Sequence, residues 1–411
     1  HFTCSDPAYS FSELLKKLDR NPSTLRLPGN TNQEAEGYLK MGYVPAPHYL
    51  RQGARTVSWY HGPLTTGPET ADISLPVPAS DQLLRYYESN GMFDISYAAA
   101  WELGRLLALR DKSFSTSLYR WKRTHVQTLR KAEQVIAHES GHLPETAGTV
   151  QDPQDLPEVV KNWFDDIGHL KGVPFNYLVP DERMLPIESI RFFRVDRLWM
   201  ECLLDGAFSI GRVTTDDHQR DRKIRETISQ QNEQMELSGF LMRSEAVSGW
   251  PGLMIEGYNC KPQKTKSQDS NTPQEDINKN PIPESNKLPL LRMERLSKNV
   301  LLCLFSGNLQ TVDIHLKPET LHFGVTAGNG SYNKELRDKN GIENKNYTVT
   351  ITLNNNRTIK MTDLISGINS QYTALSEDQK DNIDWNKTPT SAEFALQMIE
   401  GVQKVRFISS G

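Results

Sequence analysis

One polar segment, residues 261–287, constrains how the rest of this chain can be organised. Its sequence, KPQKTKSQDSNTPQEDINKNPIPESNK, contains two isoleucines and no aromatic residue. Because such a segment cannot bury enough apolar surface to offset the entropy of ordering, we expect a disordered linker or inserted loop. Runs typical of strands lie on both sides of it. This arrangement favours an insertion within one β-rich unit over a boundary between unrelated domains.

The β-rich region is expected to comprise residues 173–260 and 288–411. Short runs of β-branched and aromatic residues, bounded by Gly, Pro or Asp, are typical of strands. Such runs are found at 187–195, 206–215, 238–247, 251–259, 299–307, 310–317, 320–325, 347–354, 357–363 and 404–409, and a helix is expected at 391–402.

Helical periodicity dominates residues 75–172, where apolar positions recur at spacings of three and four. We expect helices at 81–89, at 95–111, from about Ser115 to His138, and at 156–170, with Ser80 and Asp94 as the N-caps of the first two. On the second of them, Leu103, Leu106 and Leu107 belong to the expected buried face. Residues 1–74 alternate short helical and extended pieces. The predicted fold class is therefore α+β: an N-terminal and central helical region, followed by a β-rich region that the disordered insertion interrupts.

Composition narrows the class of protein. A chain of 411 residues exceeds the usual length of one domain, and a net charge of −4 gives no reason to expect nucleic acid as a partner. No run approaches the roughly 18 apolar residues of a membrane span. The four cysteines have no CxxC spacing, which argues against a disulfide framework and favours a reducing, cytoplasmic compartment.

The sequence HESGH, residues 138–142, matches the HExxH motif and so resembles the zincin metallopeptidases over about ten residues. On a helix, His138 and His142 would lie one turn apart and could share a zinc ion. Glu139 would then act as the general base that deprotonates a metal-bound water.

Three features weaken the zinc interpretation. Pro144 ends a helix near His142, and the apolar stripe that includes Leu118 and Ile136 leaves both imidazoles facing water. The extended zincin pattern, HExxHxxGxxH, is also broken, because Glu145 replaces its glycine and Gly148 its third histidine. A solvent-facing helix end with accidental spacing is the favoured interpretation, and a zinc site is the alternative.

A candidate interaction surface lies in RFFRVDRLWMECLLDGAF, residues 191–208. Phe192, Arg194, Arg197 and Trp199 are residue types enriched at binding hot spots. Burial in the core is the competing interpretation for the aromatic residues of this segment, Phe193 and Trp199 in particular.

Two further segments have ordinary structural interpretations. The basic stretch at 119–131, YRWKRTHVQTLRK, is expected to be a solvated helix face rather than a phosphate-binding surface. Trp59, Tyr60 and His61 are interpreted as a half-buried strand end, whose indole N–H and phenol O–H find partners at the rim.

Several segments along nearly the whole chain are similar to a family of uncharacterised bacterial proteins. They are VSWYHGPL, FDISYAAAWELGRLLAL, FNYLVPDERMLPIESIRFF, LLDGAFSIGR, SGFLMRSEAVSGWPGL and TSAEFALQMIEGVQKVRF. The resemblance implies no function. It does imply that HExxH is not a family feature at His138, and that the chain, which begins at His1, is a fragment of a longer protein.

We therefore expect a non-enzymatic structural or interaction protein of the bacterial cytoplasm, with no cofactor. Its partner would be another protein or a second copy of the chain. The alternative is a zinc-dependent metallopeptidase that uses His138, Glu139 and His142.

Metal content separates these two expectations. Purified protein should carry zinc well below one ion per chain, and chelation should leave its melting temperature unchanged. A zinc site at a hundredfold excess over Kd would instead add about 2.7 kcal/mol of stability. A chelator-induced drop in melting temperature that His142→Ala abolishes would establish the zinc site.

Overall fold

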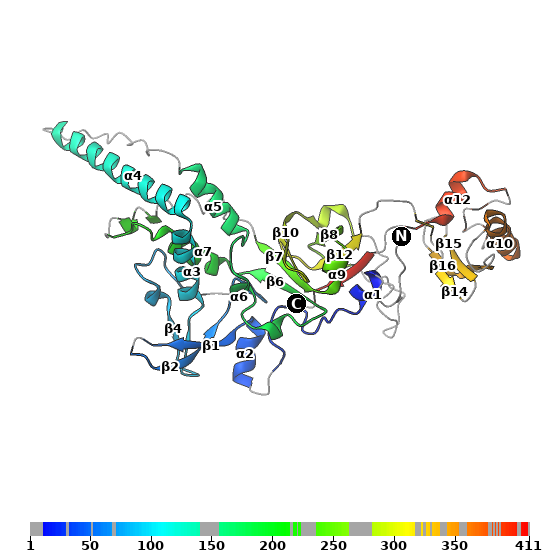
Figure 1. Cartoon of the computed structure of the whole chain (residues 1–411), viewed down its shortest axis with the longest axis horizontal. Helices are drawn as coiled ribbons and strands as arrows, with labels where there is room; N and C mark the ends of the chain where they lie inside the picture. The colour runs from blue at the N-terminus through cyan, green and yellow to red at the C-terminus, as the bar shows by residue number, and fades with distance from the viewer. Residues whose placement is uncertain are drawn as a thin grey trace. The chain divides into compact units, whose positions relative to one another are not determined.

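The computed structural model describes most of the chain as two compact units (Figure 1). One unit comprises residues 1–314 with 405–411, and the other comprises residues 315–404. The described residues are 11–29, 33–50, 52–67, 71–139, 156–213, 217–219, 221–222, 236–262, 282–316, 322–323, 326–328, 331–337, 343–352, 360–376, 380, 383, 385, 388–400 and 404–409. The fold is α+β, as the sequence predicts. Over these residues, no helix combines the length and apolar character required to cross a membrane.

The helices of the first unit precede and flank its sheets. They are α1 (Phe11–Lys16), α2 (Gln33–Met41), α3 (Ser96–Arg110), α4 (Lys112–Glu139), α5 (Glu158–Gly168), α6 (Phe175–Leu178), α7 (Arg197–Phe208) and α9 (Glu245–Gly249). Short 3-10 turns lie at Ser80–Leu83, Glu182–Met184 and Glu284–Asn286.

The described strands of the first unit form three sheets. The first has the order β1-β2-β5-β4, with strands Val44–Tyr49, Arg55–Tyr60, Met92–Asp94 and Arg85–Tyr87. The second has the order β10-β11-β7-β6-β3, with strands Leu290–Ser297, Val300–Ser306, Leu237–Arg243, Ser189–Val195 and Leu64–Thr65. The third has the order β18-β12-β8-β9, with strands Lys404–Ile408, Thr311–Leu316, Leu253–Tyr258 and Lys287–Leu288.

Two long connections leave the third sheet between neighbouring strands. Strands β8 and β9 flank the polar segment and pair directly, with Tyr258 opposite Lys287. Residues 263–281 lie outside the described part of the chain, so their disorder stays a prediction. The second unit is inserted between the neighbours β12 and β18, which a buried bidentate ion pair joins: Arg406 donates to Asp313 at 2.6 and 2.7 Å.

The second unit has its own sheet and core. Its strands are β13 (His322–Phe323), β14 (Thr326–Gly328), β15 (Ser331–Arg337), β16 (Glu343–Thr352) and β17 (Ile399–Glu400), and its helices include α10 (Met361–Ala374) and α12 (Ser391–Met398). Strands β14, β15 and β16 form one sheet. The buried core contains Leu336, Val349, Leu364, Ile368, Ile383, Trp385 and Met398.

Helices α3 and α7 cross in backbone contact at the centre of the first unit's main core. A Cβ atom on Gly104 of α3 would overlap the carbonyl oxygen of Leu203, and a Cβ on Gly206 of α7 would overlap the carbonyl oxygen of Trp101. The two glycines therefore permit this approach from both sides. Around the crossing, Trp101, Trp199 and Leu203 are at most 1% exposed.

Several expected elements differ from the structure. Residues 80–83 form a 3-10 turn and residues 85–87 form β4, because Arg85–Tyr87 pairs with β5 instead of continuing a helix. The run expected as a strand at 206–215 begins inside α7, and Met361 starts α10 where a strand was expected. Leu106 is 60% exposed, because the small residues of α3 turn toward α7 and leave it outside.

The glycine crossing makes a direct stability prediction. Gly104→Ala should destabilise the protein by at least the roughly 1–3 kcal/mol typical of an overpacked core, because the backbones of α3 and α7 must separate. Gly37→Ala is the matched control, since Gly37 is an exposed residue of α2 and a Cβ added there would meet no atom within 4 Å. It should be neutral or stabilise α2 by about 0.5–1 kcal/mol. Equal denaturation midpoints for the two variants would contradict the close crossing.

Candidate functional site

The HExxH motif falls at the C-terminal end of α4. His138 and Glu139 are the last residues of the helix, and their side chains, like the whole of His142, lie outside the described part of the chain. Among the residues that the structure does describe, no three His, Cys, Asp or Glu side chains gather as a metal site. The zinc hypothesis therefore stays a prediction.

Two of the four residues of the candidate interaction surface are buried. Phe192 on β6 is 5% exposed and Trp199 on α7 is 0% exposed, so both pack inside the first unit. Arg194 is half-buried and Arg197 is exposed, and each pairs with a glutamate, Arg194 at 2.6 Å and Arg197 at 3.0 Å. Burial alone accounts for the aromatic residues, because β6 is an inner strand and α7 packs on α3.

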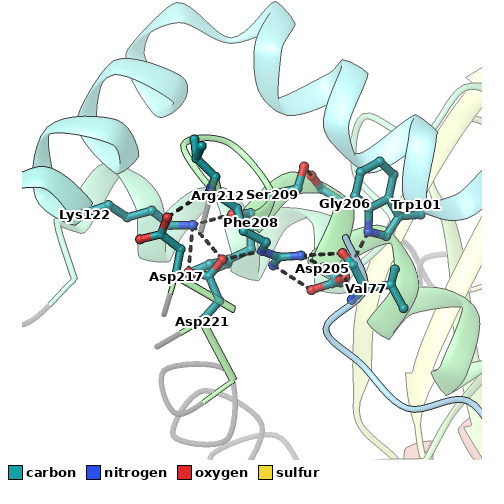
Figure 2. A network of polar contacts seen from close by, with 11 residues as sticks. Val77, Trp101, Lys122, Asp205, Gly206, Phe208, Ser209, Arg212, Asp217 and Asp221 are labelled. Carbon is teal, nitrogen blue, oxygen red and sulfur yellow. Dashed lines mark hydrogen bonds and ion pairs between the residues drawn. The ribbon is translucent and has the colours of Figure 1, made fainter. Parts of the chain in front are cut away.

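A buried ion network joins α3, α4, α7 and the segment that follows α7 (Figure 2). Asp205 of α7 is at its centre and is 0% exposed. One carboxylate oxygen, Oδ2, accepts the indole N–H of Trp101 at 2.9 Å and the backbone N–H of Val77 at 3.1 Å. Arg212 donates to the other oxygen at 2.8 Å and to the carbonyl of Val77 at 2.9 Å.

Asp221 carries the network to α4. Arg212 Nε donates to Asp221 Oδ2 at 2.6 Å, and Lys122 Nζ of α4 lies 2.8 Å from Asp221 Oδ1. Lys122 also donates to the carbonyl of Phe208, the last residue of α7. The basic stretch at 119–131 thus places one of its cations inside the protein, where the sequence predicts a solvated face throughout.

Burial and pairing set the charges of the network. Burial lowers the pKa of the Lys122 ammonium, and the Asp221 carboxylate offsets only part of this effect. Burial also opposes the charge of Arg212, but its hydrogen bonds to Asp205 and the nearby carboxylates outweigh it, so the Arg212 pKa is raised. Arg212 is therefore a permanent cation between two buried carboxylates.

The contacts within the network indicate a structural role, in which buried ion pairs stabilise the tertiary structure. Within the network, Arg212 donates hydrogen bonds to both carboxylates and to the carbonyl of Val77. The Asp205 carboxylate in turn accepts the backbone N–H of Val77. These bonds hold the loop at Val77 and the residue Asp221 against three helices. Removing one partner of such a buried pair typically costs about 3–5 kcal/mol, because the other charge stays buried.

A second buried pair, His61 and Asp196, has unfilled hydrogen-bonding capacity. His61 Nε2 and Asp196 Oδ2 lie 3.8 Å apart, and neither has a hydrogen-bond partner among the described residues. His61 Nδ1 lies 2.9 Å from the carbonyl of Gly62, and Asp196 Oδ1 caps α7 by accepting the N–H of Leu198. The pair links the end of β2 to the start of α7.

The strand end before this histidine differs from its sequence interpretation. Trp59, Tyr60 and His61 are 5%, 7% and 0% exposed, so they are buried rather than half-buried. The Trp59 indole N–H and the Tyr60 hydroxyl have no hydrogen-bond partner among the described residues. Aromatic packing accompanies their burial: Tyr38 of α2 stacks on Trp59 with ring centroids 4.8 Å apart.

Beyond Trp59, the β1–β2 hairpin leaves one face open to solvent. Pro47 of β1 lies opposite Val57 of β2, and Pro45 and Tyr49 share that face because side chains alternate along a strand. Tyr49 is 66% exposed and Val57 49% exposed, and both prolines are exposed. We call these four residues the hairpin face.

Comparison of the chain with protein-family models, curated proteins and solved structures finds no match. Function must therefore be argued from the residues and their geometry.

Sequence reasoning missed the network, although one signal was present. Asp205 lies in CLLDGAF, residues 202–208, where a single carboxylate interrupts an apolar run. A buried carboxylate needs a partner of opposite charge. Interpreting 206–215 as a strand separated Asp205 from Arg212, whereas the turn that ends α7 brings them together.

The buried pair makes a pH-dependent prediction for Asp196→Asn. Burial raises the pKa of the Asp196 carboxyl above its ordinary 3.8, and His61 offsets only part of this rise. A raised pKa means that the stability contributed by this group is present below pH 3.8 and is lost as pH rises through the folded-state pKa. Asparagine keeps the oxygen that caps α7. The variant should therefore match or exceed the wild type by about 1–2 kcal/mol at pH 7, with the advantage disappearing near pH 4.

Asp181→Asn is the control with the opposite sign. The hydrogen bond from Arg183 lowers the pKa of Asp181, so its contribution is present at neutral pH and is lost as pH falls below 3.8. Denaturant unfolding at several pH values measures both variants. If Asp196→Asn is less stable than the wild type at pH 7, the ionised pair is the stable form and our assignment fails.

Proposed function

We propose that this protein is a non-enzymatic interaction or assembly component, and that the hairpin face is its contact surface. The observation that carries the proposal is the exposure of four apolar side chains, Pro45, Pro47, Tyr49 and Val57, on one face of a two-stranded projection of the first sheet. Tyrosine is enriched at protein interfaces.

The residue types of the hairpin face also limit the entropy that binding would cost. Proline fixes its own backbone, and tyrosine has few rotatable bonds, so ordering these residues on binding costs little entropy. Tyr38 stacked on Trp59 holds the base of the hairpin. The strand register also places the exposed Arg55 on this face, opposite Tyr49. An ordered surface that combines apolar residues, tyrosine and arginine is the kind of surface on which a protein partner gains affinity.

The prolines favour docking on the face over pairing at the edge. β1 is an outer strand of its sheet, and residues 45 and 47 direct their backbone nitrogens to the same side. Because β1 keeps an unbroken register with β2 from Val44 to Tyr49, these nitrogens fit the free edge, where proline offers no N–H. A further strand would therefore find few donors there.

The partner is another protein or a second copy of this chain. We place this role in a cytoplasm, an assignment supported by the wide spacing of the cysteines and by the lack of a disulfide bond at Cys202, Cys260 and Cys303.

The test compares Tyr49→Ser/Val57→Ser with Leu106→Ser/Leu109→Ser, which removes two exposed leucines from α3 instead. Sedimentation velocity measures self-association, and cross-linking with mass spectrometry after pull-down from the native host measures partner binding. We expect the hairpin variant to lose at least tenfold in association, and the α3 variant to retain it, with equal melting temperatures. Equal association by both variants and the wild type would overturn the proposal, as would a monomer that cleaves casein in the presence of zinc.

A further inference from the structure

A cavity of about 620 Å³ lies where the C-terminal end of α3, the N-terminal end of α4 and α5 meet. Its volume falls within the range of small-molecule sites. Leu107 of α3 and Ile167 of α5 are buried residues that supply an apolar floor. Trp163 of α5 supplies an aromatic wall, and its ring packs against Phe114 with centroids 4.2 Å apart.

Two cations at the cavity have no partner among the described residues. Arg110 and Lys112 line it, both are exposed, and neither has an ion pair or side-chain hydrogen bond to another described residue. A third cation, Lys171, also lines it but lies 2.6 Å from Asp166. The lining therefore combines an apolar floor with unneutralised positive charge.

The carboxylates of the lining are already engaged. Asp111 accepts the backbone N–H of Phe114 at 3.0 Å, at the start of α4, and Asp166 is bound to Lys171. Two carboxylates against three cations leave the lining with a net positive charge.

We propose that this cavity binds a small molecule that carries an anionic substituent on a flat apolar group. The flat group lies against Trp163 and Leu107, and the anion lies toward Arg110 and Lys112. This site is separate from the hairpin face, and the proposal does not depend on the protein's interaction role.

Phenyl phosphate is the probe, with phenol and inorganic phosphate as its two halves. Isothermal titration calorimetry on the full chain measures their binding. We expect saturable binding of phenyl phosphate that is at least tenfold tighter than that of either half. The reason is that its ring contacts the apolar residues of the cavity while its phosphate binds the two cations. If inorganic phosphate binds as tightly as phenyl phosphate, the aromatic part of the proposal is wrong.

Two double variants of equal charge test the position of the site. Arg110→Ala/Lys112→Ala should weaken phenyl phosphate binding at least tenfold. Arg120→Ala/Arg123→Ala removes two exposed cations of α4, the helix that also carries Lys112, from positions that do not line the cavity, and should leave binding within twofold of the wild type. Equal losses in both variants would show a general attraction to positive charge on α3 and α4 and would overturn the proposal. So would the absence of saturable binding at millimolar phenyl phosphate.

Discussion

The backbone contact between α3 and α7 is the constraint on which the first unit depends. Gly104 and Gly206 let each helix reach the carbonyl oxygens of the other, and no residue with a Cβ fits at either position. The close approach also brings Trp101 within hydrogen-bonding distance of Asp205. One geometric feature therefore fixes both the apolar core and the position of its central charge.

The ion network follows from that placement. A carboxylate buried at Asp205 would be strongly destabilising alone, and Arg212 neutralises it through the turn that ends α7. Arg212 then needs a second carboxylate, which Asp221 supplies, and Asp221 in turn binds Lys122. Along the network, each side chain neutralises the charge of the side chain before it. The chain of contacts ties the loop at Val77, α4 and the segment after α7 to a single crossing.

The extent to which the sequence predicts this structure depends on the range of the forces involved. Strands at 189–195, 237–243 and 300–306 and helices at 96–110 and 158–168 carry local signals, and each overlaps its expected range. The largest difference is at the strand expected over 238–247, which ends at Arg243. The pairing of Arg85–Tyr87 with β5 overrides helical periodicity, because strand pairing depends on a distant partner. The glycine crossing could not be predicted, since Gly104 weakens a helix locally and only contact with Leu203 explains it. Of the candidate site residues, Phe192 and Trp199 are buried, and the aromatic composition that suggested an interface follows equally from the core.

Native-state hydrogen exchange of the α3 and α7 amides tests most directly whether the crossing is the central element of the fold. If the two helices hold the unit together, their buried amides should exchange only through global unfolding, with one shared free energy equal to that from denaturant titration. The amides of β6 and β7 should exchange at that same or a lower free energy. If α3 opens at a clearly lower free energy than these strands, the crossing is a dispensable contact and the account is wrong.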